Sequence, residues 1–178
     1  SVAGLNILLR EKGRYITADD QQAFIPRLEP YAAAIEKHLI PKPRLDMVKI
    51  FSKTIRVHSM IDISDGLAAE LHHLCTGSGV GAAVYEHNIP VDGVTQQIAG
   101  EFSVSPIEYA LYGGEEYELL FTLSEAEYRK LEPLTSDVTI IGRVTEPERG
   151  VVLVHENGEH EPLNPKGWDH FSANTGHN

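Results

Sequence analysis

A strand–helix–strand unit between residues 54 and 86 constrains the fold of this chain more than any other stretch. The segment TIRVHSMI, at its start, has the length and the β-branched content of a buried strand. A helix is expected from about residue 65 to residue 75, because its leucines recur at helical spacing along one face. The segment CTGSGVGAAVYE then leads through a glycine turn into a second strand.

The rest of the chain continues this alternation of helices and strands. Apolar periodicity and capping residues predict further helices over residues 2–13, 18–25, 31–39, 46–54, 94–102 and 124–134. Further strands are expected after the glycine pair at 113–114, over 137–144, and in a hairpin over 150–163 that turns at Asn157 and Gly158. Strands separated by helices, with at least one hairpin, indicate an α+β fold in which helices cover a mixed β-sheet.

Composition narrows the range of partners. The chain has 26 acidic and 15 basic residues, a formal net charge of -11, and no basic stripe interleaved with aromatic residues, which argues against nucleic acid. No apolar run approaches the roughly 18 residues of a membrane span, and no secretion signal is visible. Cys75 is the single cysteine and cannot form an internal disulfide. We therefore expect a cytoplasmic protein with no membrane partner.

Two aspartates stand where the first strand meets the helix, in the segment SMIDISDGLAAEL. Asp62, Ser64 and Asp65 are followed by Gly66. One interpretation is capping, in which Asp62 or Ser64 accepts hydrogen bonds from first-turn amides and Asp65 favours the positive end of the helix. The other is a Mg²⁺ site, because hard cations bind a few carboxylates together with phosphate oxygens. The residues alone favour the two interpretations equally.

A second acidic group follows a glycine turn in the segment GGEEYEL. Gly113 and Gly114 allow the backbone to approach a ligand closely, and Glu115, Glu116 and Glu118 follow at the start of a predicted strand. The alternative is an exposed acidic strand edge that discourages aggregation.

Trp168 is the only tryptophan and stands among polar residues in GWDHF. It either packs over an edge of the core or presents a flat apolar face to an aromatic ligand.

Five segments in this order, SMIDISDGLAAEL, SGVGAAVYEHNIPV, YGGEEYELLFT, IIGRV and GWDHF, resemble the C-terminal half of the thiamine-monophosphate kinase family. That family belongs to the superfamily of aminoimidazole ribonucleotide synthetase, whose C-terminal domain implies α/β/α layers that are partly ferredoxin-like. The resemblance implies that residues 1–171 form the C-terminal domain. The last residues, SANTGHN (172–178), are expected to form a flexible tail. It also implies that an N-terminal domain, absent from this sequence, supplies most ATP contacts and a homodimer interface.

The resemblance also implies an activity and a set of site residues. The family uses ATP and Mg²⁺ to convert thiamine monophosphate to thiamine diphosphate. Asp62 and Asp65 would be the Mg²⁺ ligands, Ser64 a nucleotide contact, and Glu115 and Trp168 substrate contacts. No general base is expected, because phosphoryl transfer depends mainly on positioning and charge neutralisation.

Some alternatives stay open at this level. Glu116 stands where the family has aspartate at least as often, so either Glu115 or Glu116 could be the acid that contacts substrate. The chain could also belong to a related enzyme with another small substrate, or to a non-catalytic binding module. Residues 15–39 have no assigned role, and we expect the chain alone to lack kinase activity.

Overall fold

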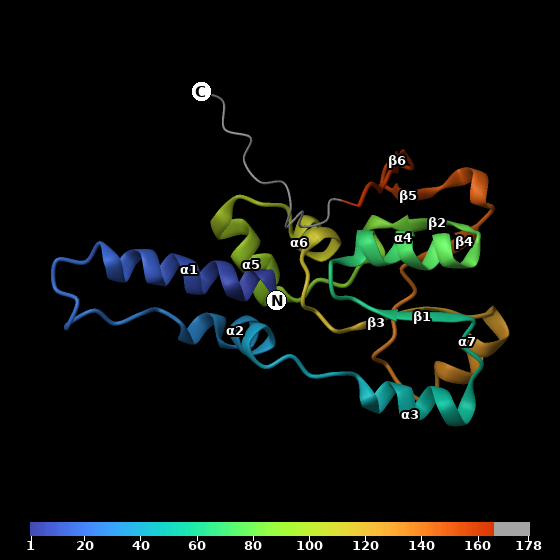
Figure 1. The fold of residues 1–178 in the computed structure, drawn as a ribbon, viewed down its shortest axis with the longest axis horizontal. Coiled ribbons are helices and arrows are strands. Elements are labelled where there is room, and N and C mark those ends of the chain that lie inside the picture. Colours follow the sequence, from blue (N-terminus) through green and yellow to red (C-terminus); the bar gives the residue numbers. More distant parts are fainter. Residues whose placement is uncertain (166–178) are drawn as a thin grey trace.

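The computed structural model describes residues 1–165, in which helices pack against two sheets (Figure 1). The α-helices are α1 Val2–Ile16, α2 Ala32–Leu39, α3 Leu45–Thr54, α4 Leu67–Ser78, α5 Gly93–Phe102, α6 Pro106–Tyr112 and α7 Glu125–Leu131. The 3-10 helices are η1 Glu29–Tyr31, η2 Glu86–Asn88 and η3 Pro147–Arg149. The strands are β1 Ser59–Asp62, β2 Gly81–Tyr85, β3 Leu119–Thr122, β4 Gly142–Thr145, β5 Val151–Val154 and β6 His160–Pro162.

The expected α+β fold is confirmed, with the strands divided between two sheets. β1 and β3 form an antiparallel pair in which Asp62 lies opposite Leu119. The second sheet has the order β4-β2-β5-β6, and it is mixed because β2 and β5 run parallel while its other pairs are antiparallel. The parallel pair brings together strands that are far apart in sequence.

Helix α4 packs against both sheets and carries the main core (Figure 1). Its Leu67, Leu71 and Leu74 belong to the same buried cluster as residues of β2, β3 and β5. Side chains alternate across a strand, so β3 contributes Leu120 to this cluster while Phe121 packs with α3 and α7 on the other face. The two-stranded sheet therefore lies between α4 and the pair α3 and α7, which fixes the end of β1 from both sides.

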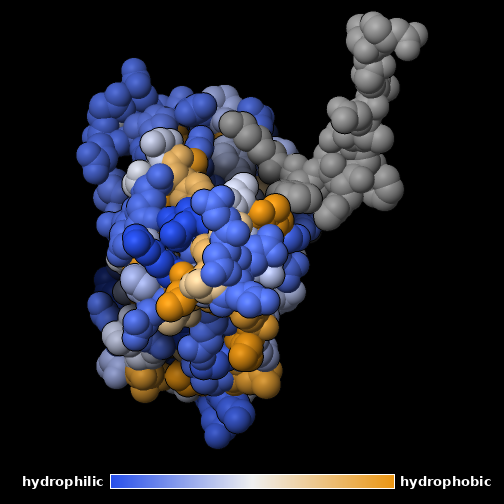
Figure 2. All heavy atoms as spheres, turned by 90° about the vertical axis from the view of Figure 1, so that its left-hand side faces the viewer, coloured by the Kyte–Doolittle hydropathy of each residue, from blue (hydrophilic) through white to orange (hydrophobic). Residues whose placement is uncertain are grey.

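Helices α1, α2 and α5 form a smaller cluster at one end of the molecule (Figure 1). Ile7 and Ile98 are fully buried there. Figure 2 shows this end to be largely hydrophilic, with apolar residues in scattered patches. Tyr15, Ile16 and Ile25, where α1 leads towards α2, are exposed.

Several predicted elements differ from the structure. The helix expected over 18–25 is wrong, because the Asp20 carboxylate accepts the backbone N–H groups of Gln22 and Ala23 and holds a turn there. Helix α1 continues past Gly13 to Ile16 instead of ending at the glycine. Residues 137–141 have no regular structure, and α6 was not predicted.

Other predictions are confirmed. Ser124 caps α7 by accepting the backbone N–H of Glu127, and Gly79 ends α4 in a left-handed conformation before β2. None of the helices among residues 1–165 is long and apolar enough to cross a membrane. The tail expected over 172–178 lies outside the described residues.

Candidate functional site

The two acidic segments identified in the sequence lie side by side. β1 and β3 pair antiparallel, so the loop that follows β1 meets the loop that precedes β3. Backbone hydrogen bonds join the two loops: the N–H of Glu115 donates to the Ser64 carbonyl at 2.7 Å, and the N–H of Tyr117 donates to the Ile63 carbonyl at 2.9 Å. The fold thus brings residues some 50 positions apart into one site.

Glycines make this close approach possible. A Cβ atom on Gly114 would lie 2.4 Å from the carbonyl oxygen of Ser64, far inside van der Waals contact. Gly66 has φ of 100°, and a Cβ atom there would lie 2.8 Å from the Leu111 carbonyl oxygen. Both loops therefore need glycine at these positions. The sequence predicts that Gly114 lets a ligand approach, whereas in the structure Gly114 packs against the other loop.

The geometry of the aspartates does not match capping. Gly66 is the N-cap of α4, and no side chain caps this helix. Within residues 1–165 the carboxylates of Asp62 and Asp65 have no hydrogen-bond or ion-pair partner, and both residues are exposed. The interpretation in which Asp62 or Ser64 accepts first-turn amides is therefore wrong.

The two aspartates do not form a complete metal site with other residues in the described part of the chain. Within residues 1–165 no group of three or more His, Cys, Asp or Glu side chains is arranged to hold a metal ion. Two exposed carboxylates fit a Mg²⁺ ion that takes its remaining ligands from phosphate oxygens and water. Asp62 and Asp65 are thus suited to a cation that arrives with a phosphorylated ligand.

Ser64 is held by a residue that the sequence analysis missed. Its hydroxyl donates to Oε1 of Glu70 at 3.1 Å, and the backbone N–H of Asp65 donates to the same oxygen at 3.1 Å. Glu70 is only 2% exposed although it is charged. The signal in the sequence was an acid in the first turn of α4, on a face otherwise made of buried apolar residues.

The loop before β3 has an unusual backbone. Glu115 has φ of 62° and Tyr117 has φ of 53°, both in the left-handed region that non-glycine residues rarely occupy. The Tyr117 hydroxyl donates to Oε2 of Glu115 at 2.7 Å. This hydrogen bond, with the charges of Glu115 and Asp62, raises the pKa of Tyr117. The expectation that these residues already form a strand is wrong, because β3 begins at Leu119.

Two of the three glutamates in this loop are paired with cations. Lys37 lies 3.0 Å from Glu116 and 3.6 Å from Glu118, and Arg44 lies 2.8 Å from Glu118. Glu115 has no cation partner among residues 1–165. The acidic edge considered from the sequence is therefore partly neutralised, and Glu115 is the glutamate left available to a ligand.

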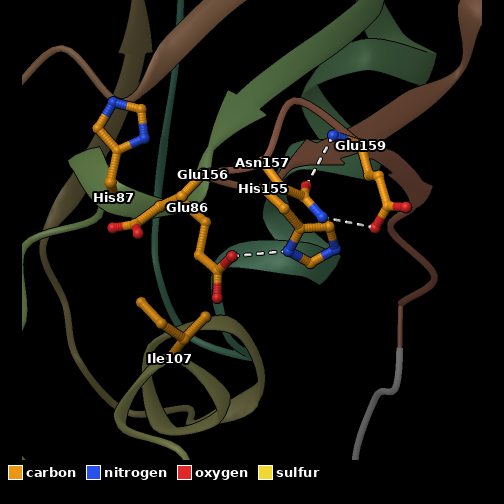
Figure 3. A pocket seen from close by; sticks show the side chains of 7 residues that line it. All are labelled: Glu86, His87, Ile107, His155, Glu156, Asn157 and Glu159. Atoms are coloured by element: carbon orange, nitrogen blue, oxygen red, sulfur yellow. Dashed lines mark hydrogen bonds and ion pairs between the residues drawn. The ribbon is translucent and has the colours of Figure 1, made fainter.

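A separate hollow lies elsewhere on the molecule. It has a volume of about 580 Å³, and the residues that line it come from η2, from α6 and from the turn between β5 and β6 (Figure 3). His155 bonds to Glu86 in its wall. Asp62, Ser64, Asp65 and Glu115, the expected site residues within residues 1–165, do not line this hollow. Trp168, the remaining one, lies outside the described residues.

Comparison with known proteins identifies the family of this chain. Residues 8–155 match the family model described as AIR synthase related protein, C-terminal domain. The chain belongs to this family. That match covers the β1–α4 junction and the loop before β3, which together make the site.

Several proteins similar in sequence to this chain are thiamine-monophosphate kinases. The thiamine-monophosphate kinase of Aquifex aeolicus is 37% identical over 172 residues, which is 96% of this chain and 48% of that protein. The thiamine-monophosphate kinase of Bacillus subtilis is 30% identical over 175 residues, 96% of this chain and 49% of that protein. The chain spans about half the length of these curated relatives.

Solved structures give the same fold. One described as AaThiL complexed with AMPPCP and TMP has a TM-score of 0.72 and 37% identity, and the match covers 95% of this chain and 47% of that one. The thiamine-monophosphate kinase of Stenotrophomonas maltophilia has a TM-score of 0.66 and 26% identity, with 89% and 48% covered.

Proposed function

We propose that this chain serves in the ATP-dependent phosphorylation of thiamine monophosphate to thiamine diphosphate. The observation that carries the proposal is the pair of exposed carboxylates of Asp62 and Asp65, which have no partner among residues 1–165 and lie beside the loop that holds Glu115. The names of its relatives support this substrate. The solved complex of AaThiL with AMPPCP and TMP supports a nucleotide and a second ligand in the same fold.

Each site residue has a role in this proposal. Asp62 and Asp65 hold Mg²⁺, Ser64 contacts the nucleotide, and Glu115 and Trp168 contact thiamine monophosphate. Bound Mg²⁺ neutralises the charge of the transferred phosphoryl group. The protein residues orient the two substrates, and none of them acts as a general base, since positioning and charge neutralisation dominate this reaction.

Electrostatics favour this division of roles. A chain with net charge -11 repels polyphosphates unless its acids are neutralised. Lys37 and Arg44 already neutralise Glu116 and Glu118. The remaining acids can then attract Mg²⁺ and the cationic ring of thiamine without excess negative charge at the phosphates.

The rest of the activity belongs to the complete protein. We propose that an additional domain supplies most ATP contacts, further Mg²⁺ ligands and a homodimer interface, because the chain spans about half of its relatives. Ser1, directly before α1, lies beside Glu116, so this end of α1 is next to the site. We place the enzyme in the cytoplasm, where ATP is available.

The test is a coupled ADP-release assay on the complete protein with thiamine monophosphate. We expect Mg²⁺-dependent turnover that falls by at least about 100-fold in Asp65→Asn, the scale on which essential charge stabilisation is lost. Residues 1–178 alone should show none. Turnover by this chain alone would contradict the division of roles, and turnover only with an aminoimidazole ribonucleotide precursor would contradict the substrate.

A further inference from the structure

We propose that Glu70 is a positioning residue that fixes the aspartate loop, residues 62–65, in the conformation that binds the cation. The inference rests on the proposed function, because it assigns Glu70 a role toward the same cation. It concerns a buried charged group that the phosphoryl transfer itself does not use.

The two hydrogen bonds that the Glu70 side chain accepts within residues 1–165 come from residues before its own helix. Its Oε1 accepts the hydroxyl of Ser64 and the backbone N–H of Asp65, each at 3.1 Å. Helix α4 begins only at Leu67, after the Gly66 N-cap. The carboxylate therefore reaches back past the start of α4 and ties down the loop that carries the two aspartates.

Packing alone does not explain an acid at this position. Glu70 is 2% exposed and lies between Ala69 and Leu71, both of which are buried. Burying a carboxylate is unfavourable unless hydrogen bonds compensate for the lost water, whereas an apolar side chain would bury at no such cost. Among residues 1–165, the hydrogen bonds that compensate come from Ser64 and Asp65, so the side chain serves the loop.

Loss of the Glu70 carboxylate should affect cation binding more than the stability of the chain. Glu70 accepts the backbone N–H of Asp65 and so fixes the backbone from which the Asp65 side chain projects. This in turn fixes the orientation of the Asp65 carboxylate relative to Asp62. Removing a group that hydrogen-bonds to a metal ligand and orients it typically lowers metal affinity by about 10- to 100-fold. We expect loss of Glu70 to weaken cation binding by about 10-fold.

The experiment measures Mn²⁺ binding, as a probe of the Mg²⁺ site, by electron paramagnetic resonance on the complete protein in the presence of AMPPCP. Thermal unfolding is recorded on the same samples. Glu70→Ala removes the acceptor, and Glu70→Gln retains an acceptor oxygen. The matched control is Glu11→Gln: Glu11 is 4% exposed and also accepts a backbone N–H, from Arg27. Its other hydrogen-bond partners, Arg10 and Arg14, lie in α1 and outside the two loops of the site.

We expect Glu70→Ala to weaken Mn²⁺ binding by about 10-fold, and Glu70→Gln to restore most of the affinity. Glu11→Gln should lower the unfolding temperature without changing Mn²⁺ affinity. Unchanged affinity in Glu70→Ala, or equal losses in the alanine and glutamine variants, would overturn the inference. If Glu70→Ala does not fold, Glu70→Met keeps the side-chain length without the acceptor and is judged by the same criteria.

Asp65→Asn separates this inference from the proposed function. If Asp65→Asn weakens Mn²⁺ binding and Glu70→Ala does not, only the role of Glu70 fails. If neither variant changes Mn²⁺ binding, the cation site itself is wrong.

Discussion

At the scale of single residues, the site depends on one tyrosine in a strained backbone. Tyr117 has φ of 53° and donates its hydroxyl to Glu115. Left-handed backbone at a non-glycine residue costs free energy and persists where surrounding contacts impose it, often at functional sites. The two loops impose it here, because the Tyr117 amide is bonded to Ile63 across the site.

We expect Tyr117→Phe to release Glu115 and to raise KM for thiamine monophosphate by about 3- to 10-fold, the scale of one typical hydrogen bond. Both kcat and the unfolding temperature should change little, because the ring is retained. Steady-state kinetics on the complete protein measure the two constants separately. A fall in kcat with KM unchanged would show that the hydroxyl acts in the reaction and not on Glu115.

Gly114 gives a second prediction at this scale. Gly114→Ala should destabilise the fold by about 1–3 kcal/mol, as overpacking does, because its Cβ would meet the Ser64 carbonyl. Gly100 in α5 is the control: a Cβ there meets nothing within 4 Å. Gly100→Ala should stabilise by about 0.5–1 kcal/mol. Urea unfolding measures both changes, and equal effects in the two variants would refute the close packing of the loops.

At the scale of elements, the connection from α2 to α3 holds the acidic loop through charge. Arg44, at the start of α3, bonds to Glu118 and lies 3.1 Å from Asp137. We expect Arg44→Ala to destabilise by about 1 kcal/mol, since a network exceeds an isolated surface pair. Lys42→Ala is the control, because Lys42 is 78% exposed and Glu36 is its one ion-pair partner among residues 1–165. The difference in unfolding free energy between Arg44→Ala and Lys42→Ala, measured by urea unfolding, should shrink in 1 M NaCl. A difference that does not depend on salt would contradict an electrostatic origin.

The β5–β6 hairpin gives a pH-dependent prediction. His155 bonds to Glu86 at 2.6 Å and to Glu161 at 3.1 Å, and these contacts, Glu86 first, raise the pKa of His155 above its ordinary 6.5. The protonated form is thus favoured in the folded state. The stabilisation of the folded state by protonated His155 is complete below about pH 6.5, and it is lost as pH rises through the higher pKa of the folded state.

Thermal unfolding between about pH 5.5 and 9 tests this, because the histidine titrates there while carboxylates stay ionised. The unfolding temperature of wild type should exceed that of His155→Gln most at the acid end, and the gap should close as pH rises. Glu86→Gln should reduce the same pH dependence. A gap that widens with pH would contradict the assigned sign.

The elements also show what the sequence could predict. Local signals were sufficient where capping and periodicity agree, as for the Ser124 cap of α7 and the Gly79 end of α4. They failed over residues 18–25, where the Asp20 side chain competes with the helix for backbone amides. Local patterns also placed Glu116 and Glu118 in a strand, because nothing nearby in sequence indicates the contacts with Lys37 and Arg44.

At the scale of the whole molecule, one layered arrangement creates the site. The β1–β3 pair lies between α4 and the pair α3 and α7, so the ends of its strands are fixed on both faces. The types of residue at the site could be read from the sequence. The sequence could not show that these residues lie close together, because their proximity depends on pairing between strands that are separated by about 60 residues.

The most direct test of the central claim is a crystal structure of the complete protein with Mg²⁺ and thiamine diphosphate. The account predicts carboxylate oxygens of Asp62 and Asp65 at about 2.1 Å from Mg²⁺ that also binds phosphate oxygens. Asp62 and Asp65 turned away from the cation, and bonded only to backbone amides, would contradict it.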